Sequence, residues 1–122
     1  MADLTLEEFE RQVTSACATS VIVASISTVK SGVTWMNLRA HLTDGSFADA
    51  FYNEATGKTA FALIKGESRI FGADNTGGWH WHPFDAPDSH VPISEAVSFD
   101  KFLSQIEEHL KSQSDETQVN SE

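Results

Sequence analysis

The sequence predicts a single α+β domain in which an antiparallel five-stranded meander is flanked by an N-terminal and a C-terminal helix, packed in two layers. Apolar residues recur at helical spacing near both ends of the 122-residue chain, and between these segments they alternate with polar residues. Short turns separate the predicted strands, and such turns join only antiparallel neighbours because parallel strands need a long crossover. The amphipathic helices and the half-polar sheet each have an apolar face to bury, which favours packing the helices on the sheet.

The N-terminal helix is expected over about residues 5–18. Thr5 is followed three residues later by Glu8, the spacing of a capping box, in which each side chain bonds the other residue's backbone N–H. The residues that follow at helical spacing form one apolar stripe: Leu6, Phe9, Val13 and Cys17. Cys17 is therefore predicted to be a small core residue, since buried thiols are usually unreactive.

Five strands are expected, at residues 21–29, 33–42, 47–53, 58–65 and 68–74. The second shows the clearest alternation, with Leu38 and Ala40 on one face and Arg39 and His41 on the other. A second amphipathic helix is expected from about residue 98. Residues 1–111 thus form the predicted domain, and residues 112–122, which have almost nothing apolar to bury, form a predicted disordered acidic tail.

Composition and charge exclude several classes of protein. The chain is 40% hydrophobic and 21% charged, as packed domains are, and it has no apolar run of the ~20 residues that cross a bilayer. A single cysteine and an acidic start that is unlike a secretory signal lead us to expect a cytoplasmic protein that does not use a membrane. The net charge of −10, with no cluster of Lys and Arg, disfavours a general nucleic-acid-coating role.

Residues 75–97 are expected to form one long loop, and this loop concentrates the chemistry of the chain. It contains three of the five histidines and two of the three tryptophans, and loops of such length in compact domains are often functional. In an extended segment, residues two apart point the same way. His80 and His82 are then expected to share one face, while Trp79 and Trp81 anchor the loop to the domain from the other.

Three uses of these histidines are open from the sequence. With His90 or Asp74, the pair has enough donors to ligate zinc or another divalent transition metal. Histidines can also act as general acid and base, with arginine to hold an anion. The third use is only structural, because the rings can satisfy backbone groups of a long loop. The candidate catalytic residues are His80, His82, His90 and Asp74, with the same three histidines as metal candidates, and the candidate anion-binding residues are Arg69 and Arg39.

A hairpin at Asp44-Gly45-Ser46, the segment 69–75 and a stretch rich in Trp, His and Pro follow one another along the chain. This arrangement resembles the TumE-like family of small prokaryotic proteins, which are described as toxins of toxin–antitoxin pairs or as uncharacterised. The similarity covers about residues 40–110. Asp74-Asn75 matches the family's Asp-Asn, whereas Gly72-Ala73 stands where the family has Arg-Tyr. The resemblance implies a toxin encoded beside a helix-turn-helix antitoxin, with RNA as its target.

The leading prediction is a toxin-like protein that acts on RNA through the histidine loop. One histidine would take the proton of a 2′-hydroxyl, another would protonate the leaving oxygen, and Arg69 or Arg39 would stabilise the phosphate. Two alternatives stay open. One is a non-catalytic module that binds a protein partner through Trp79, Trp81 and Phe84, and the other is a metal-binding accessory protein.

Overall fold

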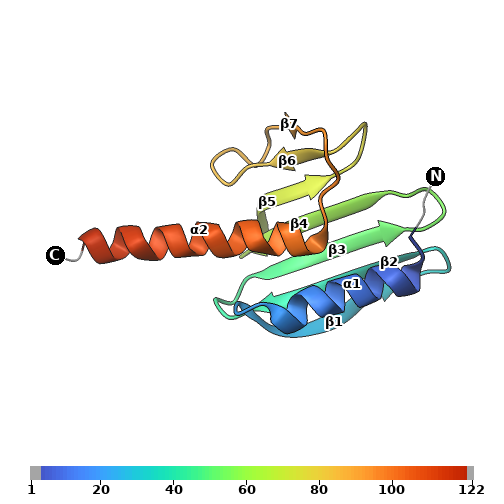
Figure 1. Ribbon diagram of the computed structural model, residues 1–122, viewed down its shortest axis with the longest axis horizontal. Coiled ribbons are helices and arrows are strands. Elements are labelled where there is room, and N and C mark those ends of the chain that lie inside the picture. The colour runs from blue at the N-terminus through green and yellow to red at the C-terminus, as the bar shows by residue number, and fades with distance from the viewer. Residues whose placement is uncertain (1–3, 121–122) are drawn as a thin grey trace.

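The computed structural model describes residues 4–120, and their side chains as far as residue 113. The described chain begins with helix α1 (Leu6–Thr19) and ends with helix α2 (Phe99–Asn120) (Figure 1). Between the helices, the strands form one sheet in sequence order: β1 (Val23–Ser31), β2 (Trp35–Leu42), β3 (Phe47–Asn53), β4 (Thr59–Lys65), β5 (Ser68–Asp74), β6 (His80–His82) and β7 (Val91–Pro92). Every neighbouring pair is antiparallel. The predicted α+β class and the antiparallel meander between two helices are therefore confirmed.

The prediction of five strands is wrong, because part of the segment 75–97 is also paired into the sheet. His80–His82 forms β6 on the edge of β5, and Val91–Pro92 forms β7 on the edge of β6, which makes a sheet of seven strands. These two strands have three and two residues, too few for a period of two to stand out in the sequence. Their pairing depends instead on the edge of β5, whose backbone N–H and C=O groups need partners.

The local patterns that are clearest in the sequence are present in the structure. Thr5 and Glu8 form the predicted capping box at the start of α1. On β2, Leu38 is buried and His41 is exposed, so the two side chains lie on opposite faces, as the alternation predicts. In the turn between β2 and β3, Gly45 has a φ of +90°, the left-handed conformation for which an Asp-Gly turn is favoured.

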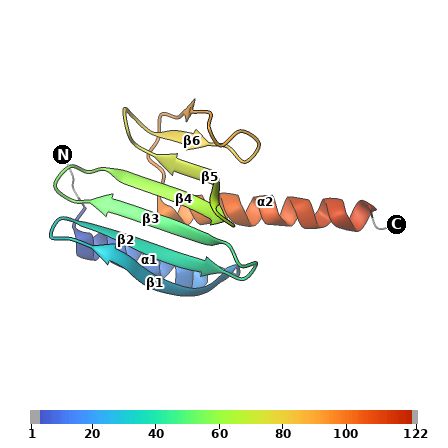
Figure 2. The ribbon, with the colours of Figure 1, turned by 180° about the vertical axis from the view of Figure 1, so that it is seen from behind.

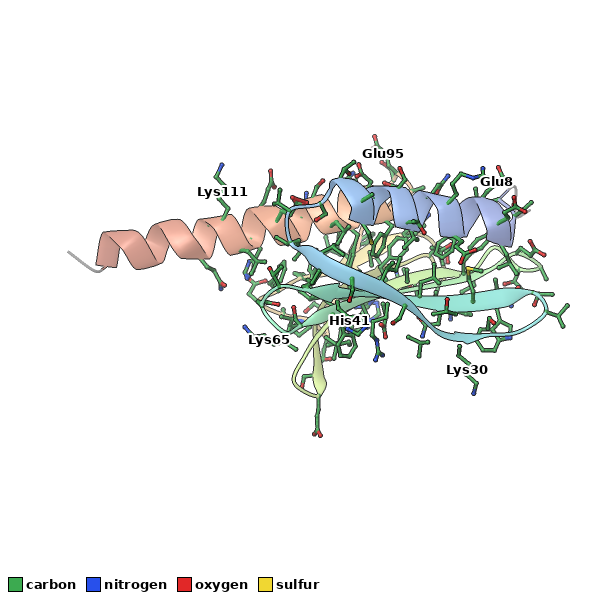
Figure 3. The ribbon with its side chains drawn as sticks, turned by 90° about the horizontal axis from the view of Figure 1, so that it is seen from below. Glu8, Lys30, His41, Lys65, Glu95 and Lys111 are labelled. Carbon is green, nitrogen blue, oxygen red and sulfur yellow. The ribbon has the colours of Figure 1, made fainter. Side chains whose placement is uncertain are left out.

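Both helices lie on the same face of the sheet (Figures 1 and 2), and Figure 3 shows Lys30 on the opposite side, pointing away from the helices. The core lies between the helices and this face of the sheet. Cys17 of α1 is part of it, as predicted, and burial raises the pKa of its thiol to about 11, so the thiol stays protonated at neutral pH. The most deeply buried large side chains are Val13, Phe102, Leu103 and Ile106.

Helix α2 continues to Asn120, through most of the range for which the sequence predicts a disordered tail; residues 121–122 of that range lie outside the described residues. In Figure 1 its C-terminal part extends past the sheet. Extending an existing helix by one residue is far easier than starting a new one, so a segment with little to bury can still continue α2. Within residues 4–120, no helix combines the length and the apolar character needed to cross a bilayer.

Candidate functional site

The pairing of strands β5 and β6 places two histidines and a carboxylate on the same face of the sheet. Gly77 and Gly78 turn the chain back after β5 with φ angles of +69° and +109°, which glycine adopts readily. The pairing of β5 with β6 then sets His80 opposite Asp74 and His82 opposite Gly72. Residues directly opposite each other on an antiparallel pair share a face, so the two imidazoles and the carboxylate lie close together.

The tryptophans on either side of His80 point into the domain. Trp81 stacks on Phe71 with ring centroids 5.3 Å apart, and Trp79 stacks on Phe61 at 6.3 Å. Both tryptophans are partly buried against the core, and so is Phe84. The anchoring role predicted for the tryptophans is therefore confirmed. All three aromatic side chains that the sequence offered for an exposed interface make contacts within the domain.

His90 joins the pair from the loop that precedes β7. The centroid of its ring lies 4.7 Å from the rings of both His80 and His82, and those two rings are 4.9 Å apart. Each histidine offers one ring nitrogen, and these three atoms all lie within 4.8 Å of one another. The structure thus brings together the three histidines that the sequence singles out. Strand pairing, rather than an irregular loop, positions two of them.

Asp74 lies beside this cluster and contacts two of its rings. Its Oδ2 is 2.8 Å from Nε2 of His82, and its Oδ1 is 3.2 Å from Nε2 of His80. Burial by itself would raise the pKa of Asp74. The hydrogen bonds from His82 and from the backbone N–H of Thr76, together with the nearby imidazoles, outweigh burial and lower that pKa. The carboxylate is therefore ionised at neutral pH and accepts a hydrogen bond from the ring of His82.

His82 is the most buried member of the cluster, with 2% of its surface exposed. Its Nε2 faces Asp74, whereas its Nδ1 is buried and has no hydrogen-bond partner among the described residues. A buried polar atom without a partner costs roughly 1–3 kcal/mol. When the ring proton is on Nε2 and is donated to Asp74, Nδ1 keeps a free lone pair, which is the state in which imidazole binds a metal.

His80 and His90 differ in how firmly their rings are held. Nδ1 of His80 lies 3.1 Å from the carbonyl oxygen of Gly78, so a proton on Nδ1 can be donated there while Nε2 keeps its lone pair. His90 is exposed and completes the cluster from the solvent side. The site therefore combines a buried ring, a ring oriented by the backbone and an accessible ring.

The two arginines predicted to bind an anion have different surroundings. Arg39 donates two hydrogen bonds to Asp49, at 2.8 and 3.1 Å, and its guanidinium lies 3.8 Å from the ring centroid of Phe47. It stands on β2, which is separated from β6 by three strands, so the structure does not bring it to the cluster. Arg69 stands on β5, beside the cluster, and donates to the backbone carbonyl of Pro87.

Gly72 leaves space for its neighbours in the site because it has no side chain. A Cβ atom at this position would lie 3.0 Å from the carbonyl oxygen of Phe61, 3.3 Å from Cδ of Arg69 and 3.6 Å from Cδ2 of His82. The absence of a side chain therefore lets Arg69 and His82 pack close to this part of β5. The only sequence signal for this role was a glycine inside a strand pattern, which often marks a close approach of other groups.

Comparison with protein-family models, curated proteins and solved structures gives no match. The chemistry available at the site therefore follows from its own donors. Three imidazoles, one oriented by Asp74 and one by the carbonyl of Gly78, can ligate a metal ion or transfer protons.

Proposed function

We propose that the chain binds a divalent transition metal, zinc most readily, through one ring nitrogen each of His80, His82 and His90. The observation that carries this function is the approach of one ring nitrogen from each of the three histidines to within 4.8 Å of one another. Nδ1 of His82 is also buried without a hydrogen-bond partner among the described residues, and a metal bound there would give it one. Three histidines are a known ligand set of catalytic zinc sites, in which the fourth position holds water.

The groups around the histidines support metal binding. A histidine that ligates a metal usually donates its other ring N–H to a carboxylate or a backbone carbonyl, which fixes the tautomer and the orientation of the ring. Asp74 is placed to do this for His82, and the carbonyl of Gly78 for His80. Imidazole donors suit zinc, copper and nickel better than magnesium or calcium, which prefer oxygen ligands.

The spacing of the nitrogens is compatible with a metal centre that tightens on binding. Zinc–nitrogen bonds of about 2.0–2.1 Å in a tetrahedral site put the nitrogens about 3.3 Å apart. In the structure, the three ring nitrogens lie within 4.8 Å of one another, so they would have to move closer when zinc binds. The exposed ring of His90 is the one with most freedom to close this distance. In a two-layer domain, with the helices as one layer and the sheet as the other, the centre lies on the open side of the sheet.

Titration of the metal-free full chain with zinc tests this function. We expect one zinc ion per chain, and with cobalt(II) in its place we expect the visible absorption bands of a tetrahedral site. The His90→Ala variant should bind zinc about tenfold more weakly or worse. His41→Ala is the matched control, because His41 is an exposed histidine on β2, which contacts Ser27 of β1 and is separated from β6 by three strands. Absence of zinc binding by the wild-type chain, or equal binding by both variants, would contradict the function.

A second candidate function is that of a cytoplasmic toxin-like protein that acts on RNA, as the resemblance to the TumE-like family implies. The hydrogen bond between Asp74 and His82 favours it, because a carboxylate that orients an imidazole is a common feature of general acid–base sites. In the metal-free site, one imidazole would take the proton of a 2′-hydroxyl and exposed His90 would protonate the leaving oxygen. A helix-turn-helix antitoxin is the partner that the resemblance implies.

Expression of the chain without its neighbouring gene tests the toxin function. We expect growth to stop on induction, and we expect the His80→Ala/His82→Ala double variant, shown by circular dichroism to be folded, to restore growth. His41→Ala serves again as the control and should remain toxic. Normal growth with the wild-type chain at confirmed expression levels would count against a toxin, whereas a folded double variant that stays toxic would count against the histidines.

A further inference from the structure

Arg69 links the start of β5 to the loop that carries His90. Its Nη2 donates a hydrogen bond of 2.9 Å to the carbonyl oxygen of Pro87, which lies 18 residues further along the chain. Pro87 is three residues before His90 in the loop between β6 and β7. On its way to this loop the side chain of Arg69 passes over Gly72, where the space of a Cβ is left open between Arg69 and His82.

The loop between β6 and β7 is held at few points. At its start, Phe84 is stacked between Phe71 and His109, with ring centroids 4.2 and 3.5 Å away. Two backbone turns follow, in which Ala86 donates to Pro83 and Ser89 donates to Ala86. Within the part of the chain that the structure describes, the bond from Arg69 is the one side-chain hydrogen bond to residues 85–90.

We propose that Arg69 is the positioning residue for His90, and this inference rests on the proposed metal-binding function. By holding Pro87, Arg69 keeps the end of the loop close to β6, so that His90 stays within reach of His80 and His82. A loop residue that is ordered only when the metal binds loses backbone entropy at that step, which weakens binding. Arg69 removes part of this cost in advance, which raises metal affinity without any contact to the metal.

Arginine suits this task better than other side chains. Its guanidinium is planar, always charged and rich in N–H donors, so a bond to a backbone carbonyl is retained over a wide pH range. This role differs from the anion-binding role that the sequence predicts for Arg69, because its Nη2 donates a hydrogen bond to the backbone carbonyl of Pro87 in the loop.

Zinc titration of Arg69 variants of the full chain tests the proposal. Arg69→Gln should weaken zinc binding about tenfold, the lower end of the effects seen for groups that orient metal ligands. Arg69→Lys, which keeps a cationic N–H donor on a long side chain, should recover part of the loss. In a His90→Ala background, Arg69→Gln should have no further effect, because the residue that it positions is gone. Arg39→Gln, an arginine on the same sheet that bonds Asp49 instead of the loop, should bind zinc like the wild-type chain.

Amide hydrogen exchange in the metal-free chain separates failure of this inference from failure of the proposed function. Arg69→Gln should speed exchange at Ala86 and Ser89, whose N–H groups close the loop turns, and leave exchange in β2 and β3 unchanged. If the wild-type chain does not bind zinc but the loop still loosens, only the proposed function fails. If zinc binds and Arg69→Gln costs as much affinity with His90 as without it, or leaves the loop unchanged, Arg69 does not position His90.

Discussion

Zinc at one hundred times its dissociation constant will raise the free energy of unfolding of the wild-type chain by about 2.7 kcal/mol, and His82→Ala will lose most of this gain. His82 supplies the buried donor of the proposed centre, and its Nε2 connects the centre to Asp74. If the substitution weakens zinc binding about 100-fold, the same zinc concentration only equals the new dissociation constant and adds ~0.4 kcal/mol. Urea unfolding with and without zinc measures both gains.

Without zinc, His82→Ala is expected to have opposing effects on stability. The substitution removes Nδ1, a buried atom whose missing partner costs free energy, but it also removes the hydrogen bond to Asp74 and leaves a cavity. The zinc-dependent part of the stability is therefore the diagnostic quantity. His41→Ala should retain the whole zinc-dependent gain. A His82→Ala chain that zinc stabilises as much as the wild-type chain would exclude His82 as a ligand.

The parts of the fold that the sequence predicts correctly depend on interactions between near neighbours. The capping box of Thr5 and Glu8 spans three residues, and the alternation on β2 needs only one buried face. Strands β6 and β7 are defined by their pairing on the edge of β5 and on each other, not by a pattern of their own. A strand of two or three residues is too short to show a period of two, so the sequence predicts a loop over residues 75–97.

The candidate site divides in the same way. That His80 and His82 share a face follows from a period of two, and the paired β5 and β6 strands have this geometry. The approach of His90 to His80 depends on how the loop between β6 and β7 folds, which the sequence does not show. The partner of Arg69 is a backbone carbonyl, and because every residue has one, no residue type in the sequence points to this contact. Arg39 is held by Asp49 across two strands, a pairing that requires the strand register to be known.

Phe102→Ala is expected to cost about 3–5 kcal/mol of stability, the usual range for removing a fully buried phenylalanine. Phe102 has 0% of its surface exposed and contacts four aromatic rings of the core, with centroids between 5.2 and 6.5 Å away. For a domain of this size, the melting temperature should fall by about 15 °C. Ser104→Ala, on the exposed side of the same helix, should change stability by less than about 0.5 kcal/mol. If Phe102→Ala does not fold, Phe102→Leu should fold with a smaller loss.

Zinc binding should survive the loss of Phe102 even though stability falls. One of the rings that Phe102 contacts is Trp81, which lies between His80 and His82 in β6. Alternation along the strand sends Trp81 into the core and the two histidines to the opposite face, and Trp81 still stacks on Phe71 when Phe102 is removed. The zinc affinity of folded Phe102→Ala should therefore stay within about threefold of the wild-type value by titration at low temperature, the precision expected for sites that act independently. A much larger loss would show that the core contact of Trp81 with Phe102, rather than strand pairing, sets the geometry of the histidines.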